Sequence, residues 1–292
     1  MSRQLALLVN PSSGGGRALK VLRRVSAELD QLGASQLTIE TKSLEHAAEE
    51  ARLAAERGET PTTVGGDGLV RQVAGALRGT ETPVAIIPAG RGNDFARVLG
   101  IPLDPVDAAR VALEGDVRVV DVAEVNGTPF IGIASLGYDS DANKIANEAR
   151  LVRGNFVYVY AGLRALVRWK PATFTAVVDG QSHTVRGYGV AVGNSKAYGG
   201  GMYLLPHAEL DDGKLEVLMD EDHSKLTFLG DIVRCFKGKH IGLPYVHLFQ
   251  GSVVEVSADR PFTVYADGDA LATTPATMRV EPRCLRVVVP RG

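Results

Sequence analysis

The segment 63–70, with the sequence TVGGDGLV, constrains this chain more than any other part of it. A short β-prone run ends at Gly65 and Gly66, Asp67 and Gly68 follow, and apolar residues then recur at helical spacing: Val70, Val73, Ala74 and Leu77. This pattern predicts a strand, a tight loop and a helix. Glycine lets backbone N–H groups approach an anion closely, and a helix N-terminus adds a partial positive charge. The segment therefore indicates either a polyphosphate site or an ordinary turn with an acidic tip.

The acid in this loop limits the chemistry further. A carboxylate at Asp67 would repel a phosphate group unless a cation or an incoming hydroxyl lay between them. If the loop binds phosphate, Asp67 therefore indicates a Mg²⁺ ion or a substrate proton nearby.

A second glycine-rich loop follows the next predicted strand, residues 83–87. It has the sequence GRGND over residues 90–94, in which Asn93 or Asp94 suits the N-cap of a short helix. A third loop, residues 10–17, follows the first predicted strand but lacks the Lys-Ser/Thr pair of a Walker A motif. Glycine-rich loops at the ends of neighbouring strands are typical of a nucleotide site in an α/β sheet.

Composition excludes several classes of protein. The 292 residues suffice for about two domains, and the net charge of -2 gives no support for a nucleic-acid partner. The two cysteines, Cys235 and Cys284, are far apart in the sequence, which fits a reduced, cytoplasmic protein. We see no signal-peptide pattern and no apolar run near the roughly 20 residues of a membrane span, so we expect any membrane contact to be peripheral.

The order of the predicted elements divides the chain in two. Strands and helices alternate up to about residue 121, which predicts an α/β nucleotide-binding domain with a mostly parallel sheet over residues 1–121. Short strands then dominate, separated by turn-forming pairs such as Asn126-Gly127 and Asp179-Gly180. Residues 122–282 are therefore expected to form a second, β-rich domain, a sandwich interrupted by helical segments near 138–169 and 224–237.

Two acidic motifs occur in this second part. Asp211-Asp212-Gly213 could hold a hard cation through oxygen ligands, or it is a solvated turn. Asp267-Gly268-Asp269 could supply a general base, although Asp-Gly turns are common.

Taken together and in order, these motifs resemble those of the diacylglycerol kinase-like lipid kinases. That group contains the bacterial soluble diacylglycerol kinases and the sphingosine and ceramide kinases. NAD kinases and phosphofructokinases share a similar GGDG element but lack the later ones in this arrangement. The resemblance covers nearly the whole chain and rests on six elements: Asn10-Pro11 with its glycines, residues 65–68 (GGDG), 90–96 (GRGNDFA), 198–202 (YGGGM), 211–213 (DDG) and 267–269 (DGD).

The resemblance implies a fold and a set of site residues. An α/β domain and a β-sandwich would flank a cleft, with the final strand, about 283–292, returning to the first domain. It implies that Asp269 is the catalytic base and that Asp67 holds a catalytic Mg²⁺ or orients the nucleophile. A structural Mg²⁺ would be bound by the Asp212 carboxylate and the carbonyls of Glu209 and Lys214. The implied ATP-binding positions are Asn10, Thr41, Gly65, Gly66, Asp67, Gly68, Leu69, Val70, Arg71, Gly90, Arg91, Gly92 and Asn93.

Five positions depart from the pattern of the bacterial kinases. Leu69 replaces a threonine, Arg71-Gln72 replaces Asn-Glu, and Arg91 replaces another threonine. An arginine at position 91 would gain a charged, bidentate grip on phosphate, or it is a surface arginine packed over Asp94. Asp269 replaces a glutamate and is one methylene shorter, and a misplacement of about 1 Å can cost roughly a hundredfold in rate. We therefore expect a site tuned for another lipid, or low activity.

The lipid-binding side is less defined by sequence. An apolar, aromatic segment could lie on an anionic membrane with Trp169 at the interface, or it could be a helix packed on the sandwich with a solvated basic face. The apolar residues are 156–160, Leu163, Leu166, Val167 and Trp169, and the basic ones are Arg150, Arg153, Arg164, Arg168 and Lys170. Tyr245, His247, Leu248 and Phe249 could line an acyl pocket or belong to a core strand.

Three hypotheses for function follow. The first is an ATP-dependent kinase of a lipid hydroxyl, on diacylglycerol or a related lipid. The second is a kinase of a soluble hydroxyl substrate, as in NAD kinases. The third is a nucleotide- or lipid-binding protein that has lost catalysis, suggested by Leu69, Arg71 and Asp269. The acceptor lipid, the nucleotide preference and the oligomeric state, with a homodimer as one option, stay open.

Overall fold

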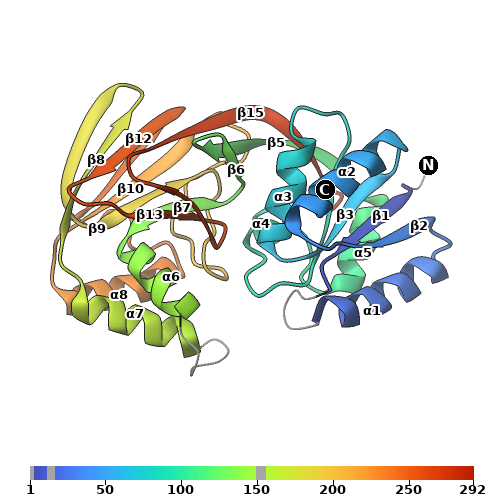
Figure 1. Cartoon of the computed structure of the whole chain (residues 1–292), viewed down its shortest axis with the longest axis horizontal. Helices are drawn as coiled ribbons and strands as arrows, with labels where there is room; N and C mark the ends of the chain where they lie inside the picture. Colours follow the sequence, from blue (N-terminus) through green and yellow to red (C-terminus); the bar gives the residue numbers. More distant parts are fainter. Residues whose placement is uncertain (1–2, 12–16, 149–155) are drawn as a thin grey trace.

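The computed structural model describes residues 3–11, 17–148 and 156–292, and it shows two lobes joined by a long two-stranded ribbon (Figure 1). The first lobe is built on a parallel sheet of order β2-β1-β3-β4. Its strands are β1 (Leu5–Val9), β2 (Gln36–Glu40), β3 (Thr60–Gly65) and β4 (Ala85–Pro88). Its helices are α1 (Arg17–Gln31), α2 (Leu44–Glu56), α3 (Asp67–Leu77), α4 (Asp94–Val98) and α5 (Pro105–Glu114).

Short-range chemistry fixes where these helices begin. The Ser43 side chain accepts a hydrogen bond from the His46 amide and caps α2. Asp104 caps α5 in the same way through the Val106 amide, with Pro105 at the first helical position. Apolar faces of the helices then pack on both sides of the parallel sheet, which is buried at β1, β3 and β4.

The second lobe is an antiparallel, β-rich sandwich, as the sequence predicted. Its sheet has the order β14-β13-β7-β9-β8-β12-β15-β5-β6, and β10 pairs with β9 and β11. The strands are β5 (Asp116–Val125), β6 (Thr128–Phe130), β7 (Ile133–Gly137), β8 (Ala172–Val178), β9 (Gln181–Gly193), β10 (Leu215–Glu221), β11 (Val246–Gly251), β12 (Val253–Ala258), β13 (Thr263–Ala266), β14 (Asp269–Thr273) and β15 (Ala276–Val289). The helices are α6 (Tyr138–Glu148), α7 (Phe156–Arg168) and α8 (Lys225–Cys235). Both Asx-Gly pairs form tight hairpin turns with positive φ, 49° and 85° at Asn126-Gly127 and 45° and 84° at Asp179-Gly180.

The ribbon of β5 and β15 connects the lobes. The strand β15 is continuous, with a register shift between Glu281 and Leu285. Arg283 adopts a φ of 51° at this shift, and its amide donates to the Asp121 carboxylate. The end of β15 also lies beside Val84, whose amide donates to the Arg286 carbonyl.

Trp169 is buried, not interfacial. Its side chain is 3% exposed, and its ring packs against Tyr138, Tyr188 and Phe262. The hypothesis that Trp169 lies at a membrane interface is therefore wrong, because the end of α7 turns this residue toward the sandwich core. Arg150 and Arg153 lie outside the described residues. Among those described, no helix is long and apolar enough to cross a membrane.

Candidate active site

The two glycine-rich loops meet at the carboxyl ends of β3 and β4. Gly65 pairs with Pro88 in the parallel ladder, so the loop after each strand begins at the same edge of the sheet. A Cβ atom on Gly90 would lie 2.4 Å from the Cα of Gly66, which no side chain can tolerate. The glycines at positions 66 and 90 therefore allow the two loops to touch, backbone against backbone.

The first turn of α3 is open to an anion. Its N-cap, Gly66, makes no side-chain capping bond, and the Leu69 and Val70 amides donate to the Gly66 carbonyl. The earlier amides of this turn, at Asp67 and Gly68, are therefore the donors that could face a ligand. Leu69 and Val70 point into the core, and a Cβ on Gly65 would lie 2.8 Å from the Leu69 Cδ2 atom. Leu69 and Val70 therefore offer a phosphate neither a side-chain donor nor a free amide, because both amides donate to the Gly66 carbonyl.

Asp67 and Asp94 converge beside Gly92. The Oδ2 atoms of both carboxylates lie 3.1 Å from the point where a Cβ on Gly92 would stand. Asp67 also accepts a hydrogen bond from the Phe95 amide at the start of α4. Burial, and then the charge of Asp94, raises the pKa of Asp67 above its ordinary value, although nearby amide hydrogen bonds oppose the shift. A cation between the two carboxylates would remove this repulsion.

Asp94 also links the two lobes. Its oxygens accept from the Gly200 amide at 2.9 and 3.1 Å, and Gly200 belongs to the YGGGM segment of the second lobe. Tyr198 and Met202 close that segment through two reciprocal backbone hydrogen bonds. Gly199, Gly200 and Gly201 all have positive φ, which explains the three consecutive glycines.

The DGD motif brings Asp269 to the same place. Its carboxylate lies over the first turn of α3, where a Cβ on Gly68 would be 3.5 Å from the Asp269 Oδ2 atom. That oxygen accepts from the Arg71 Nη2 atom at 2.7 Å. The Arg71 side chain is 6% exposed and that of Asp269 is 47% exposed, so a buried arginine from the first lobe holds a half-exposed acid from the second.

Asp267, two residues earlier, has a structural role. It accepts from the Ile131 and Gly132 amides, both at 2.9 Å, and so fixes the β13–β14 turn to the start of β7. Burial raises its pKa to about 7, with a contribution from Asp67. The Ile131 and Gly132 amides both donate to this carboxylate and so hold the turn in place.

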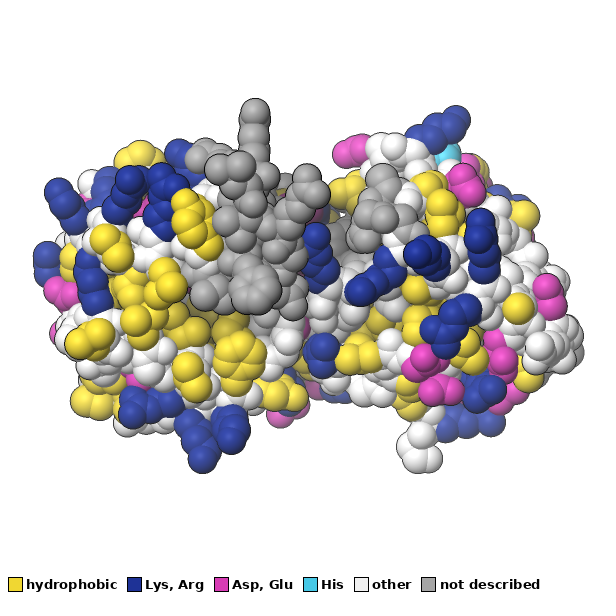
Figure 2. All heavy atoms as spheres, turned by 90° about the horizontal axis from the view of Figure 1, so that it is seen from below, with side chains coloured by type: hydrophobic (Ala, Val, Ile, Leu, Met, Phe, Trp, Pro, Cys, Tyr) yellow, Lys and Arg dark blue, Asp and Glu magenta, His cyan; other side chains and the backbone are white. Residues whose placement is uncertain are grey.

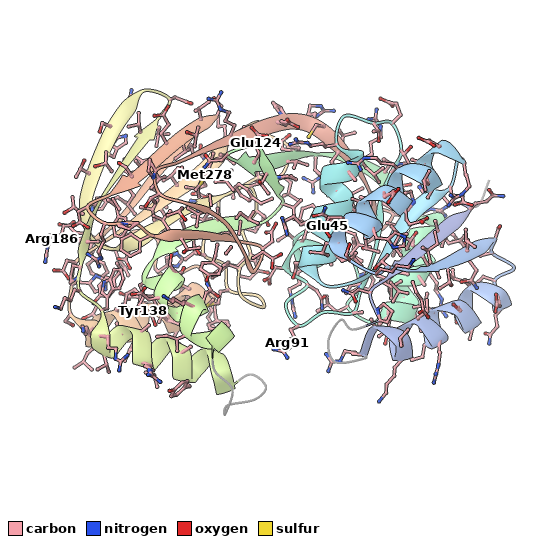
Figure 3. The ribbon with its side chains drawn as sticks, in the orientation of Figure 1. Glu45, Arg91, Glu124, Tyr138, Arg186 and Met278 are labelled. Carbon is pink, nitrogen blue, oxygen red and sulfur yellow. The ribbon has the colours of Figure 1, made fainter. Side chains whose placement is uncertain are left out.

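The remaining predicted nucleotide residues occupy different positions around this edge. Asn10 follows β1, and the Thr41 hydroxyl, at the end of β2, donates to the Val9 carbonyl. Asn93, with a φ of 53°, hydrogen-bonds Gly90 through both its oxygen and its nitrogen, so its side chain shapes the loop rather than capping α4. Arg91 is exposed and extends into the space between the lobes (Figure 3).

The proposed structural cation loop, residues 209–214, is bonded to β5. Asp212 accepts from the Lys214 amide within its own turn, and Asp211 pairs with Arg118. The buried Asp121 fastens this turn, because its carboxylate accepts from the Gly213 amide at 2.7 Å. Glu209, Asp212 and Lys214 are all exposed and close in sequence.

Three acids with defined roles were absent from the predicted site residues: Asp94, Asp121 and Asp267. The motif GRGND contains Asp94, but its position at the start of a helix favoured a capping role. Nothing in the sequence marks Asp121, which lies inside a β-strand. Either acid of the DGD turn was a candidate general base from the residues alone, and the resemblance then selected Asp269.

Asp67 and Asp94 suit a magnesium ion whose remaining ligands come from a substrate and water. In the described part of the chain, no group of three or more His, Cys, Asp or Glu side chains could hold a metal by itself. Mg²⁺ is usually bound by one or two carboxylates together with water and substrate phosphates. Asp67 and Asp94 next to the two glycine-rich loops meet this requirement.

Comparison with known proteins agrees with this geometry. Residues 4–125 match the family model of the diacylglycerol kinase catalytic domain, and residues 132–289 match that of the YegS C-terminal NAD kinase beta sandwich-like domain. A diacylglycerol kinase of Mycobacterium tuberculosis is 34% identical over 99% of this chain and 96% of its own length. One of Bacillus subtilis is 26% identical over 99% and 97%. A crystal structure of a diacylglycerol kinase from Bacillus anthracis shares the fold, with a TM-score of 0.74 at 22% identity over 99% of this chain and 97% of that one. The chain therefore belongs to the diacylglycerol kinase-like lipid kinase family, as its motifs predicted.

Proposed function

We propose that this protein transfers the γ-phosphate of ATP to the hydroxyl of a membrane lipid, diacylglycerol or a close relative. The observation that carries this proposal is the meeting of Asp67 and Asp94 from the first lobe with Asp269 from the second, directly beside the two glycine-rich loops. Phosphoryl transfer needs little beyond positioning and neutralised charge, and these groups supply both. The relatives named diacylglycerol kinase support the choice of acceptor.

In this proposal the triphosphate lies along the loops that follow β1, β3 and β4. The open first turn of α3 donates amides to it, and Arg91 adds a positive charge from the space between the lobes. Asn10 and Thr41 lie on the side of the nucleoside. A bound Mg²⁺, held by Asp67 and Asp94, would neutralise charge on the transferred group. A second, structural cation at Glu209, Asp212 and Lys214 remains part of the proposal.

Asp269 is proposed as the base. It takes the proton of the lipid hydroxyl while that oxygen attacks the γ-phosphorus and the bond to the ADP oxygen breaks. Arg71 bonds to the Oδ2 atom of this carboxylate, and within the described residues Oδ1 accepts no hydrogen bond. Arg71 thus positions Asp269, and the pairing offers a physical reason why a shorter acid serves here.

The wider setting follows from this activity. We propose that residues 1–121 with the final strand form the nucleotide domain and that residues 122–282 form the lipid domain. The protein would work in the cytoplasm and contact the membrane peripherally. A soluble hydroxyl acceptor and a binding protein without catalysis are the alternative outcomes of the test below.

The test is transfer of labelled γ-phosphate from ATP and Mg²⁺ to lipids in mixed micelles. Wild type should yield a labelled lipid, Asp67→Asn and Asp269→Asn should not, and an exposed control, Asp222→Asn, should match wild type. Product on a soluble alcohol without lipid would favour the second hypothesis. Nucleotide binding without any product would favour the third, and full activity of Asp269→Asn would overturn the choice of base.

A further inference from the structure

Exposed apolar side chains gather on two neighbouring helices of the second lobe. Of the large apolar side chains that are exposed in the described part of the chain, half lie on α7 and α8 or directly after them. They are Tyr160 (38% exposed), Leu163 (48%), Val167 (78%), Leu226 (83%), Val233 (69%) and Phe236 (51%), and we call them the α7–α8 face. Single exposed apolar residues are ordinary, but such a cluster marks an interaction surface.

The two helices form one continuous surface. The Lys225 ammonium, at the start of α8, donates to the Val167 carbonyl, near the end of α7, at 3.0 Å. The opposite sides of both helices are anchored by Leu166 and Phe228, which belong to the sandwich core. The core is thus already filled, and the α7–α8 face has apolar residues that the fold does not need. Figure 2 shows apolar side chains gathered over this lobe, with Lys and Arg side chains around them.

The exposed charged side chains of α7 and α8 themselves have one sign, although the exposed acids Glu221 and Asp222 precede α8. The helix α7 contains no acid, and the single acid of α8, Asp231, is buried and bonded to Arg234 and Tyr245. The exposed charged residues on and directly after the two helices are all basic: Arg164, Arg168, Lys170, Lys225, Arg234, Lys237 and Lys239. An apolar surface with a basic rim matches an anionic bilayer, whose head groups attract the cations while its acyl region accepts the apolar side chains. A second copy of the same face would bring like charges together.

We infer that the α7–α8 face is the surface by which this protein binds an anionic lipid bilayer, with Val167, Leu226, Val233 and Phe236 entering the interface. The inference rests on the proposed function, because a lipid acceptor requires the protein to contact a bilayer. It goes beyond that proposal by assigning the contact to two helices outside the candidate active site. In Figure 1 both helices lie along the lower edge of the second lobe, and Arg91 extends toward the same side of the molecule in Figure 3. Docking through this face would present that side to the membrane.

The test is sedimentation of the full chain with vesicles in the absence of ATP. Vesicles contain phosphatidylcholine alone or with 30 mol% phosphatidylglycerol. Wild type should bind the anionic vesicles at least about tenfold more tightly than the neutral ones. Val167→Glu and Leu226→Glu should each lower the partition coefficient by about tenfold, because a charge replaces an inserted side chain. Replacing Lys237 and Lys239 by Gln should cost about fivefold for each cation.

A matched control lies on the other lobe. Leu53 on α2 is also an exposed leucine, 39% exposed, and Leu53→Glu should leave vesicle binding unchanged. All substitutions are at exposed positions, so thermal unfolding should show intact folding. Equal binding by Leu226→Glu and wild type, an equal loss in Leu53→Glu, or binding indifferent to anionic lipid would overturn the inference. A wild-type dimer that Leu226→Glu converts to a monomer would also overturn it, in favour of a second copy.

Failure of the inference can be told from failure of the proposed function. Val167→Glu and Leu226→Glu should retain transfer to a short-chain diacylglycerol that is monomeric in solution. Lost vesicle binding with retained transfer supports the docking face. If both variants bind vesicles as wild type does and transfer is normal, the docking face is overturned and the kinase proposal stands. If binding to anionic vesicles depends on the α7–α8 face but no transfer occurs, only the kinase proposal is overturned.

Discussion

The ion pair between Arg71 and Asp269 is expected to couple the two lobes measurably. The two residues are 198 positions apart, and the Nη2–Oδ2 distance is 2.7 Å. Removing one partner of a fully buried pair costs about 3–5 kcal/mol, whereas exposed pairs contribute about 0–1 kcal/mol. Arg71 is 6% exposed but Asp269 is 47% exposed, so solvent screens the acid. We therefore expect a coupling energy of about 1–2 kcal/mol.

The assay is a double-mutant cycle with Arg71→Gln, Asp269→Asn and the double variant, unfolded by urea at pH 7. Asp269→Asn should lower the free energy of unfolding, because the guanidinium loses its charged partner while staying buried. The double variant should be destabilised by less than the sum of the single variants. Arg186 and Asp222 supply the control cycle, since they pair at 2.9 Å with side chains 61% and 38% exposed. A coupling for Arg71 and Asp269 no greater than for this exposed pair would refute the reasoning.

Three further predictions concern the loops, the acids and pH. Gly90→Ala should abolish nucleotide binding measured by calorimetry and lower the free energy of unfolding by about 1–3 kcal/mol, because its Cβ would overlap the backbone of the facing loop. The control, Gly230→Ala, has open space around it and should do neither. Asp94→Asn should keep the fold, since its oxygen still accepts from the Gly200 amide, but should raise the Mg²⁺ concentration needed for phosphate transfer at least about tenfold. Burial raises the pKa of Asp220 from 3.8 to about 8. The folded state therefore favours protonated Asp220, and stability from this group is complete below about pH 4 and is lost as the pH rises toward 8. The free energy of unfolding of Asp220→Asn in urea, relative to that of wild type, should therefore rise by about 2–4 kcal/mol from pH 5 to pH 8.5. A difference between the two proteins that does not change with pH would contradict this assignment.

The sequence by itself determined the features that depend on a few neighbouring residues. The Asn126-Gly127 turn and the Ser43 cap act through backbone within about four positions, so residue type and spacing were sufficient. Alternation of strands and helices then predicted the α/β lobe, and clustered turn pairs predicted the sandwich. The strand β14 was not predicted, because its first residue belongs to an Asp-Gly turn and its Ala-Leu-Ala-Thr run has little β preference.

Only the tertiary structure decided which distant groups meet. Arg71 was predicted to bind nucleotide, but strand pairing between β7 and β13 brings Asp269 against it. Asp94 was interpreted as a helix cap, yet its carboxylate bonds to Gly200, which is 106 positions away. Tryptophan is a residue type common at membrane interfaces, but Trp169 is buried because of the side of α7 that faces the sandwich. Local patterns carry no information about these contacts, because sheet order and helix rotation are set by packing of the whole core.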